Sequence, residues 1–179
     1  MNSAIEMIKN RRSVRSFKDE LIPRDVLETI LEAGTYAATG MNRQAPIILT
    51  VTNRALRDKL SAINAQILTA AGRDGSRDPF YGAPVVLVVL ADRNVPTCIH
   101  DGSLVMGNLM LAASELGVGS CWIHRAKETF ETEEGKEILK ALGVEGDYVG
   151  VGNCVLGYPQ GEIPAAKPRK ENYIYWAED

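Results

Sequence analysis

The chain has 179 residues, a formal net charge of −3 and 45% hydrophobic residues. This length and composition predict one globular domain, numbered 1–179, that buries a core of ordinary size. The pI near 5.5 argues against a nucleic-acid partner, and no run of about 18 apolar residues is present to cross a membrane.

The first half of the chain alternates helical and strand patterns. Ser3 to Glu6 (SAIE) form a capping-box pattern, which predicts a short first helix. Pro23 stands at the start of a second helix, whose apolar face includes Val26 and Leu31. The patterns that follow predict a loop over 36–46, a strand over 47–52 and a helix over 55–71.

The second half begins with a polar loop over 72–82 that carries two aromatic residues. The continuous apolar run VVLVVL, residues 85–90, predicts a strand covered on both faces. Further patterns predict a helix over 103–116, a strand or strand-to-loop segment over 118–123, a helix over 132–142, a strand over 148–156 and a basic tail. Helices and strands that alternate without strict regularity favour an α+β or three-layer α/β/α sandwich with a mixed sheet.

A cluster of arginines, RRSVRSF, lies between the first two helices. In an extended segment Arg11, Ser13 and Arg15 would point to one side and Arg12 to the other. Lys167 and Arg169 repeat this spacing near the end of the chain, so several donors are available for an organic phosphate. Solvated surface charge is the competing interpretation of both clusters.

Other kinds of chemistry find little support in the sequence. The segment GVGSCW lacks the third glycine of a dinucleotide loop and follows a helix, so a Rossmann site is rejected. His100, His124, Cys98 and Cys121 match no common zinc spacing, and no G-x-S-x-G elbow exists, so no metal and no catalytic side chain are expected. These absences suit a protein whose chemistry belongs to a cofactor.

The cysteines indicate a cellular compartment. Cys98, Cys121 and Cys154 are far apart and odd in number. They are interpreted as reduced thiols of a cytoplasmic protein.

Five segments together resemble the FMN-dependent nitroreductase family of oxidoreductases. They are RRSVRSF, AATGMNRQAP, FYGAPVVLVVLAD, DGSLVMGNLMLAASELGVGSCWI and a late KPR before an aromatic tail, in family order along nearly the whole chain. The resemblance implies a short, single-domain member with an α+β three-layer sandwich and a mixed, mainly antiparallel sheet. It also implies a homodimer with two interfacial FMN sites, in which the tail 163–179 packs on the partner subunit.

The resemblance also implies a set of FMN-binding residues. Those expected at the phosphate and ribityl chain are Arg11, Arg12, Ser13, Arg15, Lys167 and Arg169, with Arg15 also near the N1–C2 carbonyl edge of the flavin. The loop expected to come from the partner subunit comprises Ala38, Thr39, Gly40, Met41, Asn42 and Gln44. Backbone amides at Ile123 and His124 would approach flavin N5. The substrate pocket would include Asn64, at the pyrimidine edge, together with Phe80 and Tyr81.

The implied activity is a ping-pong reaction in which NAD(P)H reduces the flavin and an electron-poor acceptor then takes two electrons. Nitroaromatics, quinones and activated alkenes are such acceptors. A family relative that acts as an enone reductase or a reductive dehalogenase is one alternative, and a flavin carrier or redox sensor without turnover is another. The sequence does not separate them, because the phosphate site is shared and the acceptor pocket depends on shape.

Overall fold

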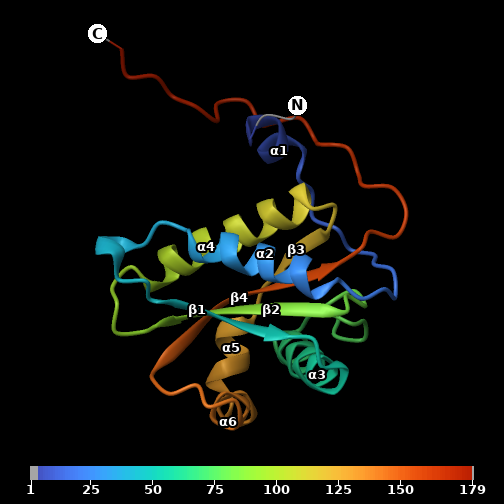
Figure 1. Ribbon diagram of the computed structural model, residues 1–179, viewed down its shortest axis with the longest axis vertical. Coiled ribbons are helices and arrows are strands. Elements are labelled where there is room, and N and C mark those ends of the chain that lie inside the picture. The colour runs from blue at the N-terminus through green and yellow to red at the C-terminus, as the bar shows by residue number, and fades with distance from the viewer. Residues whose placement is uncertain (1–3, 179) are drawn as a thin grey trace.

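A four-stranded sheet runs through the centre of the computed structural model, which describes residues 4–178 (Figure 1). The strand order is β1-β2-β4-β3, and every ladder between these strands is antiparallel. One parallel bridge, between Ser13 and Ser120, adds the segment after the first helix to the edge of β3. The bounds of the strands are β1 Pro46–Val51, β2 Val85–Asp92, β3 Gly119–Ile123 and β4 Tyr148–Gly157.

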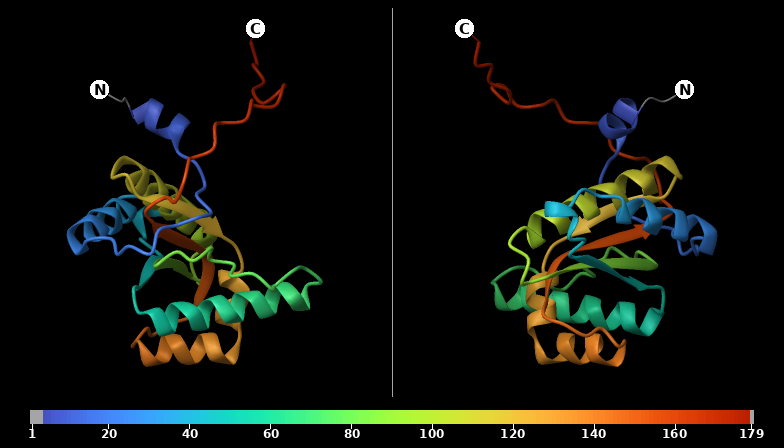
Figure 2. Two further views of the ribbon diagram at one scale, coloured as in Figure 1. Left: turned by 90° about the vertical axis from the view of Figure 1, so that its right-hand side faces the viewer. Right: turned by 60° about the vertical axis from the view of Figure 1, so that its left-hand side comes forward.

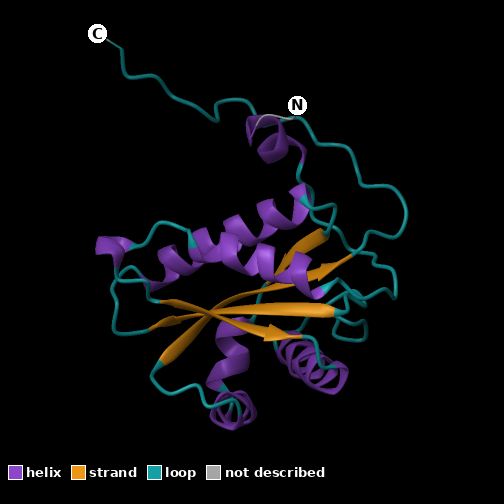
Figure 3. Ribbon diagram, in the orientation of Figure 1, coloured by secondary structure: helices purple, strands orange, loops and turns teal. Residues whose placement is uncertain are grey.

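Helices cover both faces of the sheet, so the predicted three-layer α+β sandwich is confirmed (Figures 1 and 3). One face carries α2 and α4, and the other carries α3, α5 and α6. The short helix α1 stands apart, above the α4 layer. The bounds are α1 Ala4–Asn10, α2 Arg24–Thr35, α3 Arg54–Ala70, α4 Cys98–Glu115, α5 Ala126–Glu131 and α6 Glu133–Ala141.

The central strands explain why the core has two halves. Residues 85–91 of β2 are all buried, because alternate side chains of this apolar run face the two helical layers. On β4 the chain places Gly150 where α5 crosses. A Cβ there would lie 2.2 Å from the carbonyl oxygen of Ala126, so only glycine permits this close packing of helix on sheet.

Two expectations about helices need correction. The helix expected from Ser103 begins at Cys98, five residues earlier, and α5 was not expected at all. The sheet itself agrees with the expected mixed, mainly antiparallel arrangement, since its ladders are antiparallel and the Ser13–Ser120 bridge is parallel. The first helix is present, but Ser3 of its capping box lies outside the described residues.

After β4 the chain forms a tail that extends away from the body of the molecule (Figure 2). Its aromatic end is exposed, with Tyr173 at 69%, Tyr175 at 83% and Trp176 at 79% of their accessible surface. None of the described helices is long and apolar enough to cross a membrane.

Candidate cofactor site

The arginine segment is held against β3 by its backbone and its apolar residues. Val14 N–H donates to the carbonyl oxygen of Ser120 at 2.9 Å, and Lys18 N–H donates to Tyr158 at 2.9 Å. Val14 and Phe17 are buried in the core, which anchors an extended segment between them. The predicted extended conformation is therefore present beside the C-terminal end of α4.

Arg11, Ser13 and Arg15 come together around Cys121 on β3. Burial raises the pKa of the Cys121 thiol, against the opposing influence of the Arg15 charge, a hydrogen bond with Ser13 and the Arg11 charge. Nη1 of Arg11 is buried and has no hydrogen-bond partner in the described part of the chain, and the same holds for Oγ of Ser120. A buried guanidinium nitrogen without an acceptor is costly, so this cluster has spare capacity for an anion.

The other predicted phosphate residues behave differently. Arg12 folds back on its own segment, where Nη1 donates to the carbonyl oxygens of Lys9 at 2.7 Å and of Arg11 at 2.6 Å, while its Nε is buried and has no hydrogen-bond partner within residues 4–178. Lys167 and Arg169 lie on the extended tail, where Arg169 donates to the Lys167 carbonyl oxygen. Within the part of the chain that the structure describes, no hydrogen bond or ion pair joins them to Arg11 or Arg15.

A second feature, the cleft at the end of β3, has a volume of about 400 Å³. Its walls include Asn64 from α3, Tyr81 from the loop over 72–82, and Trp122, His124 and Arg125. Asn64 is 1% exposed and its Nδ2 donates to the His124 carbonyl oxygen at 2.9 Å, while its Oδ1 has no partner. The structure thus brings Asn64, Tyr81, Ile123 and His124 to one cleft.

Phe80, expected at the substrate pocket, is instead a core residue that is 1% exposed. The guanidinium of Arg57 lies 5.5 Å from the centre of its ring. The expectation is wrong because the neighbouring Asp78 turns the loop inward, accepting hydrogen bonds from Arg57, Ser61 and two backbone N–H groups. Burial opposes ionisation of Asp78, but these hydrogen bonds outweigh it and lower its pKa.

The loop over 38–44 is locked onto the first turn of α4. Gly40 N–H donates to Oδ1 of Asp101 at 3.0 Å, and Thr97 Oγ1 donates to Oδ2 at 2.9 Å. A Cβ on Gly40 would lie 2.4 Å from Thr97 Oγ1, which explains the glycine. The apex of the loop is Met41, which is 86% exposed at a φ of 54°.

The loop and the arginine cluster lie at opposite ends of α4. The loop contacts Asp101 near the start of this 18-residue helix, and Ser13 bridges Ser120 just beyond its end. At about 1.5 Å per residue the helix is about 27 Å long. One protomer therefore keeps the two groups of predicted cofactor residues apart.

Four residues of these sites were missed by sequence reasoning. Asn153 is a polar residue inside an apolar strand, a signal that was available because buried amides are rare without a role. Asp101, at 3% exposure, and Ser120 gave no such signal, since their partners are distant in the chain. Arg125 adopts a φ of 81°, which its residue type does not predict.

A metal centre has no basis in the described geometry. Within residues 4–178, no three His, Cys, Asp or Glu side chains gather closely enough to hold an ion.

Comparisons with known proteins agree with this fold. The chain is 30% identical over 168 residues to an Archaeoglobus fulgidus protein provisionally named NADH dehydrogenase/NAD(P)H nitroreductase, covering 90% of this chain and 88% of that protein. It is 27% identical over 122 residues to a Methanothermobacter thermautotrophicus protein of the same provisional name, a match that covers 66% of this chain and 59% of that protein.

A solved structure is similar over nearly the whole chain. It is a nitroreductase with bound FMN from Bacteroides fragilis, with a TM-score of 0.90 and 30% identity, covering 99% of this chain and 100% of that chain. The model of the nitroreductase family matches residues 8–158, from the end of α1 to the residue after β4. The sheet, its two helical layers and the sequence all lead to one assignment: the chain belongs to the nitroreductase family.

Proposed function

We propose that the protein is an FMN-dependent oxidoreductase that takes electrons from NAD(P)H and passes them to an electron-poor organic acceptor. The observation that carries this proposal is the Arg11–Ser13–Arg15 cluster, with one buried guanidinium nitrogen that has no acceptor among residues 4–178. The family assignment supports it, as do the names of the Archaeoglobus fulgidus and Bacteroides fragilis relatives.

The donors and acceptors of the site fit FMN. A phosphate monoester offers oxygen acceptors and a double negative charge, which matches Arg11, Arg15 and the hydroxyl of Ser13. A flavin ring carries an imide N–H at its pyrimidine edge, which needs an acceptor. The partner-free Oδ1 of Asn64, on the wall of the cleft, supplies one.

FMN would supply reversible two-electron chemistry, so no side chain of this protein needs to act as a nucleophile. The protein's own residues bind, orient and exclude water. Arg11 and Ser13 would hold the phosphate, with Lys167 and Arg169 contributing from the tail. Arg15 would place a cation beside the ring, where positive charge favours the reduced, anionic form.

The separation of the loop and the arginine cluster along α4 supports a homodimer. The two groups can serve one cofactor only if the loop comes from a second copy, because about 27 Å of helix divides them in one protomer. The residues of that loop would then be Ala38 to Asn42 and Gln44 of the other subunit. On α4 itself, Leu104 is 51% exposed and Gly107 borders open space, which leaves a surface for a second helix.

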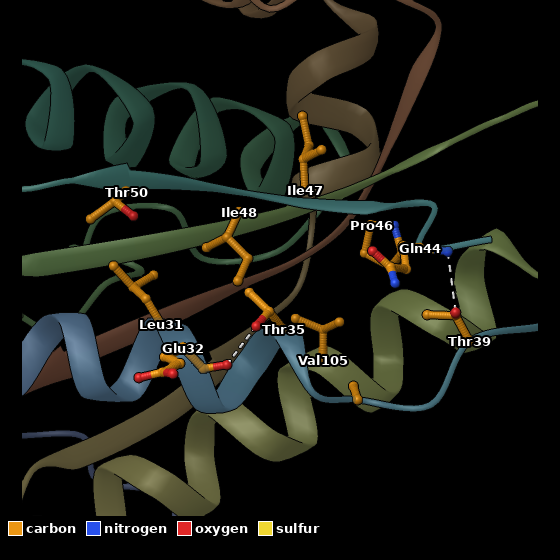
Figure 4. A pocket seen from close by; sticks show the side chains of 11 residues that line it. Leu31, Glu32, Thr35, Thr39, Gln44, Pro46, Ile47, Ile48, Thr50 and Val105 are labelled. Carbon is orange, nitrogen blue, oxygen red and sulfur yellow. Dashed lines mark hydrogen bonds between the residues drawn. The ribbon is translucent and has the colours of Figure 1, made fainter. Parts of the chain in front are cut away.

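The tail, residues 163–178, would pack on that second copy. A groove of about 480 Å³ runs along the outer edge of β1, where Leu31, Ile48 and Val105 point toward one another (Figure 4). No strand pairs with this edge among residues 4–178. The exposed, extended end of the tail, with Ile174 at 70% exposure, supplies a segment able to pair there.

The acceptor would enter the cleft beside Tyr81 and Trp122. An open aromatic wall suits flat acceptors such as nitroaromatics and quinones, and the same wall would admit activated alkenes. The three cysteines are free and buried, which supports the cytoplasm as the compartment of this protein.

The test is anaerobic reduction of the purified, FMN-loaded protein. We expect NADH or NADPH to abolish the flavin absorbance and a nitroaromatic or quinone to restore it. A protein that binds FMN but is reduced by neither nicotinamide would instead be a carrier or sensor. A protein that takes up no FMN would contradict the proposal.

A further inference from the structure

A pair of buried asparagines meets at one carbonyl group beside the cleft. Asn64 and Asn153 are each 1% exposed, on α3 and β4 respectively. Asn64 Nδ2 donates to the His124 carbonyl oxygen at 2.9 Å, and Asn153 Nδ2 lies 3.4 Å from the same oxygen and 3.4 Å from that of Ile123. Two separate elements, α3 and β4, therefore converge on one peptide group.

The held carbonyl fixes the direction of the next amide. The peptide group is planar and trans, so the His124 carbonyl and the Arg125 N–H point in opposite directions. Because the carbonyl is directed at the two asparagines, the N–H of Arg125 points away from them. It has no hydrogen-bond acceptor within residues 4–178, and Arg125 lines the cleft.

The backbone conformation of Arg125 shows that its surroundings impose the direction of this N–H. Its φ is 81° and its ψ is 8°, in the left-handed region that residues other than glycine rarely adopt. On the other side, its guanidinium donates to Glu128 Oε1 at 2.6 Å, within the first turn of α5. Two sets of contacts thus hold the strained residue in place, one through the preceding peptide group and one through its own side chain.

Resting on the proposed function, we infer that Asn153 acts together with Asn64 as a positioning residue that aims the Arg125 N–H at the ring of the bound flavin. Asn153 does not touch the ligand in this account; it acts through the His124 carbonyl. A backbone donor that is fixed before binding costs no reorganisation when the ring arrives.

The experiment compares Asn153→Ala with the unmodified protein by titrating apoprotein with FMN and with riboflavin. We expect both affinities to fall about tenfold, equivalent to about 1.4 kcal/mol, because the lost contact concerns the ring that the two ligands share. Loss of a phosphate contact would lower the affinity for FMN alone.

The matched control is Asn108→Ala. Asn108 lies on α4, and its Nδ2 also donates to a backbone carbonyl, that of Ala33 at 3.1 Å. Its flavin affinities should stay within about twofold.

A rescue separates positioning from loss of structure. Glycine adopts the left-handed conformation without strain, so Arg125→Gly in the Asn153→Ala background should restore part of the lost affinity. If Asn153→Ala does not fold, as judged by its melting curve, Asn153→Ser takes its place in the same titrations.

The outcomes distinguish this inference from the proposed function. If the unmodified protein binds neither flavin, the proposed function fails. If it binds both, and the Asn153 variant binds both with unchanged affinity or loses only FMN, the positioning role is overturned while the function stands.

Discussion

Arg57 and Arg11 are both arginines with buried nitrogens, and they differ in what the protein does with those nitrogens. In Arg57 all three are used: Nε donates to the Ala83 carbonyl oxygen, Nη1 to Asp58 and Nη2 to Asp78. In Arg11, Nη1 is buried without a partner among the described residues. A guanidinium whose three nitrogens are all paired indicates a structural role, whereas a buried nitrogen left unpaired is a place where a ligand can complete the site.

This difference also predicts which of the two arginines the apoprotein needs for its stability. Arg57 neutralises Asp78 and ties the loop over 72–82 to α3, so folding depends on it. Arg11 brings positive charge close to Arg15 with no carboxylate in an ion pair to either, within residues 4–178. The apoprotein should therefore tolerate the loss of Arg11 far better than the loss of Arg57.

The largest effect is expected for Arg57→Met. This change leaves Asp78 without its cation and should lower the free energy of unfolding by about 3 kcal/mol, as measured by urea denaturation. FMN affinity, measured under conditions where the variant is folded, should change by less than about twofold. A loss of stability below about 1 kcal/mol would show that the network is not a structural centre.

The next effect is on binding and not on stability. Arg11→Ala should weaken FMN binding by about 1.5–3 kcal/mol, the range for a hydrogen bond to a charged group. The free energy of unfolding of the apoprotein should stay the same or rise, because a buried, unpaired nitrogen is removed. Fluorescence titration and urea denaturation measure the two quantities. A variant that loses stability and keeps its FMN affinity would show that Arg11 is structural, as proposed for Arg57, and does not bind the ligand.

A smaller effect depends on pH. The pKa of Asp78 is lowered in the folded protein, so its contribution to stability is fully present above the unfolded value of about 3.9 and is lost as the pH falls through the folded value. Asp78→Asn should cost about 1–2 kcal/mol near pH 6, a modest figure because the side chain is 32% exposed. The difference from the unmodified protein should shrink below about pH 4. Urea denaturation across this pH range measures it, and a constant difference would rule out the ion pair as its source.

The smallest effect is expected for Arg12→Ala. Arg12 is adjacent to Arg11 in the chain and its Nε is also buried without a partner within residues 4–178, but its Nη1 already donates to the carbonyl oxygens of Lys9 and Arg11, which hold the side chain on its own segment. Its removal should change FMN affinity by no more than about threefold, or about 0.7 kcal/mol. A loss as large as that for Arg11 would mean that the two arginines share the phosphate.

The sequence predicted the parts of the fold whose signals are local. The run at 85–90 indicated β2, and the apolar spacing after Pro23 indicated α2. The start of α4 at Cys98 was missed because its first turn lacks apolar spacing and is fixed by Asp101, which binds the distant Gly40. The helix α5 was missed because it begins at a strained Arg125, a conformation set by packing.

The residues of the site also divide into those with a local signal in the sequence and those that only the fold brings together. Arg11, Ser13 and Arg15 are neighbours in the chain, so an extended segment was sufficient to predict that they would lie together. Asn153 and His124 are 29 residues apart, and only the folded sheet brings them into contact. Phe80 was misplaced because an aromatic residue in a polar loop suggests exposure, while Asp78 draws the loop into the core.

The central claim is that the Arg11–Ser13–Arg15 cluster binds the phosphate of FMN. The most direct measurement is the ratio of the riboflavin and FMN dissociation constants for the apoprotein, compared with that of an Arg11→Ala, Arg15→Ala double variant. We expect the unmodified protein to bind FMN at least about tenfold more tightly than riboflavin, a difference of about 1.4 kcal/mol, and the ratio to fall toward one in the double variant. Equal affinities in the unmodified protein would contradict it.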